Sequence, residues 1–369
     1  MSDRVTSLQD SLAWLLTPLS WGYAGLMRLR AWLYRNRLLA VWEPEVLTVS
    51  VGNIGWGGSG KTPLAGWLLD WAAQKGVGAL LLTRGYKAKP VAYPYVVKQG
   101  ALAEEAGDEP LLLAREHPDA RVVVDPVRTR GGRFGIRRFN PGLVVLDDGF
   151  QHMAVHRHVN LVLLRPDDLL EQWDRVIPRG SWREPKAALK RADAFLIKTG
   201  PEGFQRLRPR VDQLLGRFHK PVFSFQVAPV GVANVLSGES RRDFEGGRYL
   251  LVSGTGDPDA ILRSARHLLG GSPAKHLKYP DHHAYTKADV LDMQSAAKGL
   301  GCDFILCTPK DAVKLGPMCT PEFWQFELRM AFGPSTIGAK TPFNIWWKGR
   351  YESVYLRRVA PGKQKESNE

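Results

Sequence analysis

The chain has 369 residues, which is long enough for two domains of ordinary size, each with its own hydrophobic core. Hydrophobic and charged residues make up 44% and 24% of it, fractions that fit a folded, soluble protein and exclude a disordered or fibrous one. The formal net charge of +14 favours anionic partners, such as a nucleotide, a nucleic acid or an acidic membrane surface, but does not choose among them.

The first predicted element is a helix in an N-terminal arm, residues 1–40. Residues 11–27 carry no charge, but this run of 17 residues is just shorter than the ~18–20 apolar residues that a spanning helix needs. Acidic residues precede the run and arginines follow it, which argues against a secretory signal peptide. Leucines at helical spacing, interleaved with tryptophan and tyrosine, favour an amphipathic helix lying in the headgroup layer of an anionic membrane. A helix packed on the protein's own core is the alternative.

A parallel sheet is predicted next, within a core domain of residues 41–228. Short runs that are apolar throughout alternate with helical stretches, a pattern typical of parallel strands covered by helices on both faces. One such helix is predicted over residues 63–75 and ended by Gly76. The apolar runs are residues 45–51, 79–83, 121–124, 143–146, 160–164 and 194–197.

A second, smaller α/β domain is predicted for residues 229–345. It contains two apolar runs, residues 249–252 and 304–307, with a helix predicted over residues 258–269. A C-terminal segment, residues 346–369, follows, and from Ala360 onward it is polar and predicted to be disordered. The cysteines lack the paired spacing of a zinc site and are too few for a disulfide scaffold, which fits a reducing cytoplasm. They are Cys302, Cys307 and Cys319.

The strongest motif is a phosphate-binding loop between the first strand and the first helix of the core domain. It matches G-x-x-x-x-G-K-[ST] and reads Gly55-Trp56-Gly57-Gly58-Ser59-Gly60-Lys61-Thr62. Its glycines let backbone N–H groups curl around the β-phosphate, and the helix N-terminus adds a positive dipole. All of these residues except Trp56 are expected to bind the nucleotide, with Lys61 on the β- and γ-phosphates and Thr62 on Mg²⁺. We therefore predict a P-loop NTPase-like fold. We also predict that the protein uses ATP and Mg²⁺ to phosphorylate a hydroxyl group.

Two adjacent acids, Asp147 and Asp148, end the apolar run of residues 143–146, in the form of a Walker B segment. Mg²⁺ prefers carboxylate and water oxygens, and successive strand residues point to opposite sides of a sheet. One acid is therefore expected to hold Mg²⁺, directly or through water, and the other to orient a neighbour. A helix cap or a solvated turn is the alternative for such a pair, but the phosphate-binding loop favours the metal role.

Further segments complete a pattern that resembles the tetraacyldisaccharide 4'-kinase family, the enzymes that phosphorylate the lipid A precursor in Gram-negative bacteria. The resemblance covers about residues 46–315. Its segments are Val51-Gly52-Asn53, Leu82-Thr83-Arg84-Gly85-Tyr86, Gly107-Asp108-Glu109-Pro110, Asp147-Asp148-Gly149-Phe150-Gln151-His152, Arg183-Glu184-Pro185, Pro280-Asp281-His282-His283 and Thr308-Pro309-Lys310-Asp311-Ala312-Val313-Lys314-Leu315.

The resemblance implies transfer of the ATP γ-phosphate to the 4'-hydroxyl of a tetraacylated glucosamine disaccharide 1-phosphate, a step of lipopolysaccharide biosynthesis. It also implies peripheral attachment to the cytoplasmic face of the bacterial inner membrane. In the family, the acid matching Asp108 and the histidine matching His282 together activate the sugar hydroxyl. The acids matching Asp147, Asp148 and Glu184 lie around Mg²⁺ and its neighbours. The chain departs from the family pattern at three positions: Trp56 in the loop, Lys87 where Gly is usual and Pro309 where Glu is usual.

The residues themselves support a base near the attacking oxygen, because a hydroxyl does not ionise near neutral pH. Asp108 can accept the proton or orient a base that does, and the His282 imidazole is a suitable base. His283 is a rival, and the alternatives are an N-cap for Asp108 and a surface turn for His282. Arg183 is expected to stabilise charge on the transferring phosphoryl group. The arginine cluster of residues 121–138 is either a solvated face or a surface for the substrate's 1-phosphate or lipid headgroups.

Two other functions compete with a kinase. A P-loop ATPase of the switch or partitioning type normally has Lys where Trp56 stands, and a GTP-binding protein requires N-K-x-D, which is not seen. A nucleic-acid-binding module is suggested by the net charge alone, and we find no motif for it. We therefore expect a lipid substrate and an anionic membrane surface as partners, and no nucleic acid.

Overall fold

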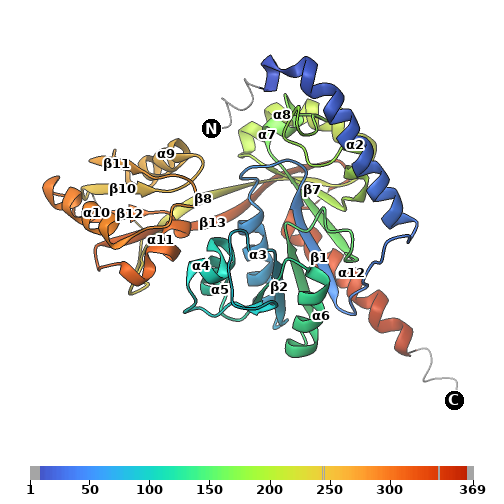
Figure 1. Ribbon diagram of the computed structural model, residues 1–369, viewed down its shortest axis with the longest axis horizontal. Coiled ribbons are helices and arrows are strands. Elements are labelled where there is room, and N and C mark those ends of the chain that lie inside the picture. Colours follow the sequence, from blue (N-terminus) through green and yellow to red (C-terminus); the bar gives the residue numbers. More distant parts are fainter. Residues whose placement is uncertain (1–8, 243, 245, 340, 364–369) are drawn as a thin grey trace. The chain divides into compact units, whose positions relative to one another are not determined.

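The computed structural model describes residues 9–242, 244, 246–339 and 341–363, and it forms two compact units that interleave along the chain (Figure 1). The first unit comprises Met1–Arg84, Asp119–Gln226 and Ala331–Glu369. The second comprises Gly85–Pro118 and Val227–Met330. The domain boundaries predicted after residues 40, 228 and 345 stay a prediction, because units defined by packing need not coincide with segments that carry separate functions.

The first unit is built on a parallel sheet whose strands are almost entirely buried. Because both faces are covered, the strands carry apolar side chains on both sides, as the sequence predicts. In spatial order the strands are β4 (Arg121–Val124), β2 (Ala79–Thr83), β5 (Leu143–Asp147), β1 (Leu47–Asn53), β6 (Val159–Leu164), β7 (Ala194–Lys198) and β8 (Val222–Asn234). Each neighbouring pair runs parallel, so the carboxyl ends of the strands share one edge of the sheet.

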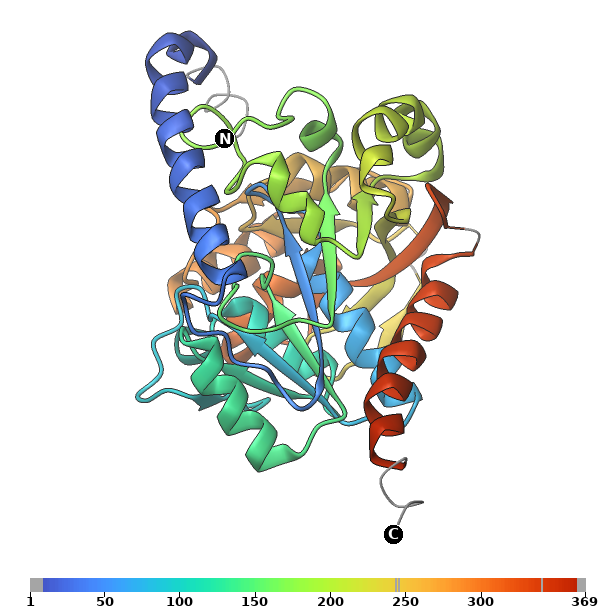
Figure 2. The ribbon, with the colours of Figure 1, turned by 90° about the vertical axis from the view of Figure 1, so that its right-hand side faces the viewer.

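Helices cover both faces of this sheet (Figure 2). On one side, α3 (Lys61–Gln74) packs against α12 (Phe343–Lys363), with the Trp71 ring 5.6 Å from that of Trp347. On the other side, α6 (Arg128–Phe139) approaches the strands so closely that a Cβ on Gly135 would lie 2.5 Å from Leu80 Cδ2. The predicted α/β class is thus confirmed. The shorter helices of the unit are α7 (Pro166–Leu169) and α8 (Pro201–Leu215), with 3-10 turns at Lys186–Arg191 and Gly216–Phe218.

The predicted N-terminal helix is α2 (Ala13–Arg35), which packs on the first unit by one side. The Ser20 hydroxyl donates to the Val176 carbonyl at 2.9 Å and accepts from the Arg179 N–H at 2.9 Å. The Tyr23 hydroxyl donates to the Arg183 carbonyl at 3.1 Å. Over the part of the chain that the structure describes, no helix is both long and apolar enough to cross a membrane.

The second unit has its own mostly parallel strands, to which β8 and β13 each contribute part of their length. In spatial order these are β11 (Lys275–Lys278), β10 (Tyr249–Ser253), β12 (Phe304–Cys307), β13 (Phe323–Thr336) and then β8, which carries the short β9 (Ser240–Arg241). The helices are α4 (Ala103–Ala106), α5 (Asp108–Glu116), α9 (Pro258–Leu269), α10 (Lys287–Gly299) and α11 (Pro309–Leu315), with the two-residue strand β3 (Tyr95–Val96) and a 3-10 turn at Gly316–Met318.

Local geometry bears on two departures from the family pattern in opposite ways. Lys87 has φ 60°, in the left-handed region where residues other than Gly are strained by ~1–2 kcal/mol, so the family's Gly suits this position better. Pro309 is the first residue of α11, where a missing N–H costs nothing. At the C-terminus, α12 extends to Lys363 and so includes residues 360–363, which were predicted to be disordered. Residues 364–369 lie outside the described residues.

Candidate active site

The phosphate-binding loop joins β1 to α3 in the first unit, as predicted. Gly57 and Gly60 have φ 101° and 88°, conformations that favour glycine. A Cβ on Gly60 would also lie 2.8 Å from a ring carbon of Phe225. The α3 helix begins at Lys61, two residues earlier than predicted, with Gly60 as its N-cap. The loop backbone therefore has the conformation that the motif requires.

Three predicted residues meet beside this loop. Lys61 Nζ lies 3.6 Å from Asp148 Oδ1, and Arg183 Nη1 donates to Asp148 Oδ2 at 2.8 Å. Burial opposes ionisation of the Asp148 carboxyl, but Lys61 and Arg183 outweigh it and hold the pKa of that carboxyl below its usual value. Asp148 also has φ 49°, a strained backbone conformation of the kind that clusters at functional sites. An ionised carboxylate thus holds two cations next to the loop.

The other predicted metal ligands have different surroundings. Asp147 is 5% exposed, and its Oδ2 accepts the Thr83 hydroxyl at 3.1 Å across the strand ends of β5 and β2. Glu184 is 1% exposed and accepts from Arg191 Nη2 at 2.8 Å. In residues 9–242, 244, 246–339 and 341–363, no three Asp, Glu, His or Cys side chains are grouped so that they could hold a metal ion by themselves.

The arginine cluster does not form one uniform basic face. Arg128 is buried, with Nη2 3.4 Å from the Asp147 carbonyl, and burial lowers its pKa to about 10 despite the nearby acids. Arg130 pairs with Asp125 at 2.8 Å, while Arg137 is exposed. The sequence did not separate the buried Arg128, which is the first residue of α6 and lies four residues after the end of β4, from its exposed neighbours.

Arg128 also acts on a histidine that the sequence analysis gave no role. Burial lowers the pKa of His152 to about 4, and the positive charge of Arg128 adds to this effect. The imidazole is therefore neutral at physiological pH. In the neighbouring Gln151, the side-chain oxygen accepts a hydrogen bond from Arg183 Nη1 at 3.5 Å, and the backbone carbonyl accepts one from Arg30 at 3.2 Å. The D-D-G-F-Q-H segment is therefore surrounded by arginines, including the Arg183 that pairs with Asp148.

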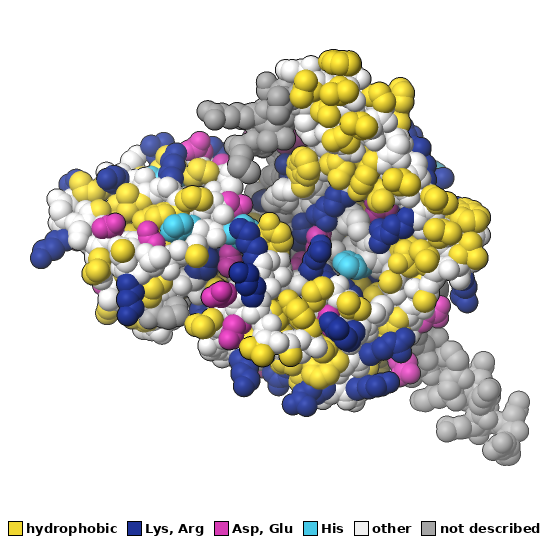
Figure 3. Space-filling view, viewed as in Figure 1, with side chains coloured by type: hydrophobic (Ala, Val, Ile, Leu, Met, Phe, Trp, Pro, Cys, Tyr) yellow, Lys and Arg dark blue, Asp and Glu magenta, His cyan; other side chains and the backbone are white. Residues whose placement is uncertain are grey.

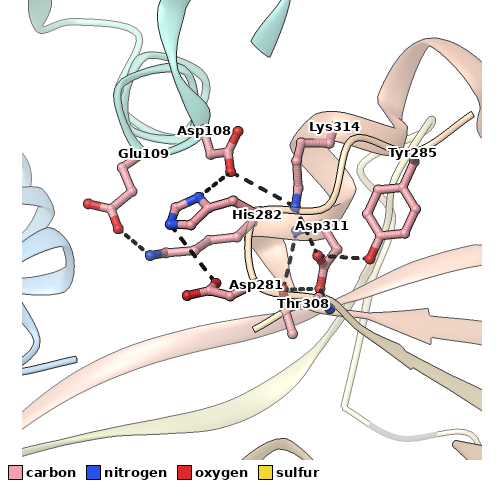
Figure 4. A network of polar contacts seen from close by, with 10 residues as sticks. Asp108, Glu109, Asp281, His282, Tyr285, Thr308, Asp311 and Lys314 are labelled. Carbon is pink, nitrogen blue, oxygen red and sulfur yellow. Dashed lines mark hydrogen bonds and ion pairs between the residues drawn. The ribbon is translucent and has the colours of Figure 1, made fainter. Parts of the chain in front are cut away.

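The carboxylate and the imidazole that are predicted to act together as the general base, Asp108 and His282, are in contact in the second unit (Figure 4). His282 Nδ1 lies 2.9 Å from Asp108 Oδ2, although the two residues are 174 positions apart in the chain. Asp108 is the first residue of α5, and His282, with φ 61°, is in the turn after β11. Both side chains are mostly buried, 16% and 24% exposed. The domain boundaries predicted from the sequence separate the two residues, whereas both lie in one compact unit.

The surroundings of His283 and the start of α5 bear on the alternatives for this pair. His283 Nε2 lies 3.2 Å from Asp289 Oδ2, at the capping box that begins α10. It is therefore His282 that Asp108 contacts. The N-cap of α5 is Gly107, and Asp108 is the first residue of the helix. Two lysines of the T-P-K-D-A-V-K-L segment were missed as neighbours of this pair, although their i, i+4 spacing places them on one helix face.

Comparison with known proteins gives a consistent result. The model of the family described as tetraacyldisaccharide-1-P 4'-kinase matches residues 12–341. The chain is 46% identical to tetraacyldisaccharide 4'-kinase of Nitratidesulfovibrio vulgaris, over 96% of this chain and 99% of that protein. It is 47% identical to the enzyme of the same name from Oleidesulfovibrio alaskensis, over 94% and 98%. A crystal structure of LpxK from Aquifex aeolicus, an "apo" form in complex with ATP, matches with a TM-score of 0.70 and 29% identity, covering 88% of this chain and 95% of that one.

Proposed function

This chain belongs to the tetraacyldisaccharide-1-P 4'-kinase family, and from that premise we propose which residues carry the reaction. The activity is the phosphorylation of a tetraacylated disaccharide 1-phosphate at its 4'-hydroxyl, in lipid A biosynthesis. Membership sets aside the switch-type ATPase alternative. What remains to be proposed is the role of each site residue, the metal and the attachment to the membrane.

We propose that ATP is the phosphoryl donor and that the P-loop holds its phosphates. In such loops backbone N–H groups and the N-terminus of the following helix bind a polyphosphate, and here α3 begins at Lys61, directly after the glycine-rich loop. Lys61 and Arg183 are already held beside the loop by Asp148, so both cations are positioned to stabilise negative charge on the transferred group. Support comes from the related crystal structure, which contains ATP.

The donor set near the loop fits Mg²⁺. Thr62, Asp147 and Asp148 supply oxygen atoms, and Mg²⁺ usually takes only one or two carboxylates because waters and nucleotide oxygens complete its octahedron. Bound Mg²⁺ would neutralise charge on the β- and γ-phosphates. Glu184 is buried and its carboxylate is paired with Arg191 at 2.8 Å. We propose that Glu184 acts by holding that arginine.

At the acceptor end, we propose that Asp108 and His282 together remove the proton of the 4'-hydroxyl as its oxygen attacks the γ-phosphorus. The observation that carries this role is the 2.9 Å contact between the carboxylate and the imidazole. It fixes the ring orientation, so that one partner orients the other in the manner of paired general bases. The pair accepts the hydroxyl proton. The bond between the γ-phosphorus and the β,γ-bridging oxygen breaks, and that oxygen leaves as part of ADP.

The test is the turnover of Asp108→Ala, His282→Ala and the double variant, measured as product with one added phosphate by mass spectrometry. Each single change should lower kcat by ~10²–10⁴-fold, with little change in KM for ATP, since a general base contributes about that much. The double variant should be no slower than the slower single variant. Losses that multiply fully would show that the two residues do not act as a unit. His283→Ala is the matched control and should retain activity.

We also propose that α2 attaches the protein to the cytoplasmic face of the inner membrane. Trp14 and Trp21 are 77% and 72% exposed, and Leu15, Leu19, Leu26, Leu29 and Trp32 are exposed as well. At ~100° per residue these side chains lie within roughly 160° of the helix circumference, opposite the buried Ser20 and Ala24. Figure 3 shows apolar side chains gathered over α2. An exposed apolar stripe bounded by Arg28 suits the headgroup layer of an anionic membrane.

A further inference from the structure

Lys314, on α11, has a buried side chain between two carboxylates of the second unit (Figure 4). The side chain is 7% exposed, and Nζ lies 3.4 Å from Asp311 Oδ1 and 3.9 Å from Asp108 Oδ2. Lysine is rarely buried unless it is paired, so these two contacts account for its position. We propose that Lys314 is a positioning residue for the reaction, which holds the Asp108 carboxylate in the orientation that contacts His282. This inference rests on the proposed role of the Asp108–His282 pair.

The anchor of Lys314 is rigid because every oxygen of Asp311 is already in use. Oδ2 accepts from the Thr308 hydroxyl at 2.6 Å and from the Gly254 N–H at 3.1 Å. Oδ1 accepts from the Tyr285 hydroxyl at 3.0 Å. Burial and the Asp311 charge raise the pKa of Tyr285, so the phenol stays protonated and remains a donor.

Asp311 is completely buried and tied to the ends of both β10 and β12, so its position is set by the sheet. Because Lys314 is paired with this fixed carboxylate, its ammonium group is fixed as well, and the Asp108 side chain adjusts its position to the lysine. Three side chains thus connect the core to the His282 imidazole. The Asp311 carboxylate pairs with the Lys314 ammonium, which pairs with the Asp108 carboxylate, which contacts the ring. Attraction between Lys314 and Asp108 restrains the Asp108 side chain at the start of α5.

The rest of α11 reinforces this alignment. Lys310, one turn before Lys314, forms an ion pair with Glu109, the residue next to Asp108. Lysines at i and i+4 lie on one helix face, so α11 forms ion pairs with both acids in the first turn of α5. Lys310 fixes the backbone of that turn through Glu109, while Lys314 acts on the Asp108 side chain itself. Of these two lysines, it is Lys314 whose ion pair reaches the proposed Asp108–His282 pair.

The experiment measures kcat and KM of the full-length enzyme with Mg-ATP and tetraacyldisaccharide 1-phosphate. Lys314→Met keeps the length of the side chain and removes its charge. We expect kcat to fall ~10–100-fold, because a small misplacement of a catalytic group costs up to that factor, with KM for ATP within about twofold of the parent. Lys314→Arg restores the charge and should recover most of kcat. Lys298→Met, an exposed lysine of the same unit, should behave as the parent.

If Lys314→Met does not fold because Asp311 loses a partner, Lys314→Met with Asp311→Asn removes both buried charges and tests the same point. A kcat within about twofold of the parent in either variant would overturn the proposal.

The decisive comparison introduces Lys314→Met into an Asp108→Asn background. If Lys314 acts through Asp108, the lysine change should then alter kcat by less than about twofold, since the interaction is already lost. A further loss as large as in the parent would show that Lys314 acts by another route and would overturn the inference. If Asp108→Asn by itself leaves kcat unchanged, the proposed role of the Asp108–His282 pair as the general base fails. The failure of that role can therefore be distinguished from the failure of the role proposed for Lys314.

Discussion

Replacing Trp14 and Trp21 by Glu should release the protein from anionic membranes without unfolding it. A tryptophan side chain offers ~150–250 Å², and these two are 77% and 72% exposed. At ~25 cal/mol per Å² their exposed surface could contribute at most about 6–9 kcal/mol to membrane binding. If half of that surface enters the headgroup layer, the loss is about 3–4.5 kcal/mol, which corresponds to a roughly 10²–10³-fold loss of affinity at ~1.4 kcal/mol per tenfold.

Substitution is a cleaner test of the membrane contact than truncation of the N-terminal arm. The inner side of α2 belongs to the core, where Ala24 is buried and Tyr23 binds the Arg183 carbonyl. Arg30 also donates to the carbonyl of Gln151 at 3.2 Å. A truncation would therefore disturb residues adjoining the proposed nucleotide site as well as the membrane contact. The two tryptophans project outward, so their replacement leaves those contacts unchanged.

The assay is sedimentation with vesicles rich in phosphatidylglycerol, at low and high salt. The double Glu variant should remain in the supernatant while its melting temperature matches that of the parent. Trp14→Phe with Trp21→Phe is the matched control and should still sediment. Sedimentation of the Glu variant at the level of the parent, with both proteins folded, would refute the assignment of this face to the membrane.

Two further predictions concern the first unit. Lys61→Ala should abolish product formation in the mass-spectrometric assay, because Lys61 is placed to contact the migrating charge; near-parental turnover would refute its role. Burial lowers the pKa of His152 to about 4, so between the ordinary value of 6.5 and pH 4 the unfolded chain binds the proton more readily than the folded one. Stability should therefore fall as pH drops through that window, by up to about 3 kcal/mol from this group, at ~1.36 kcal/mol per pKa unit. His152→Gln should show a correspondingly smaller fall in urea unfolding.

The sequence alone determined the elements whose causes are local. The phosphate-binding loop occupies eight consecutive residues, and its glycines, lysine and threonine specify a conformation and a chemistry within that stretch. The strands at Arg121–Val124 and Phe304–Cys307 and the helix at Pro258–Leu269 have the predicted bounds, because apolar runs and helical spacing are set by neighbours in the chain. The resemblance identified the family for the same reason, since its motifs are short and contiguous.

Only the tertiary structure decided which distant residues meet. Nothing near Asp108 in the sequence shows that residues 85–118 pack with the later block, where His282 and Lys314 lie. The structure shows that His282, in a turn where its φ is 61°, lies beside Asp108, and that Arg128 is buried whereas Arg137 is exposed. Local preferences specify helices, strands and tight loops, whereas contacts between residues far apart in the chain arise from the burial of whole apolar faces, which no short segment encodes.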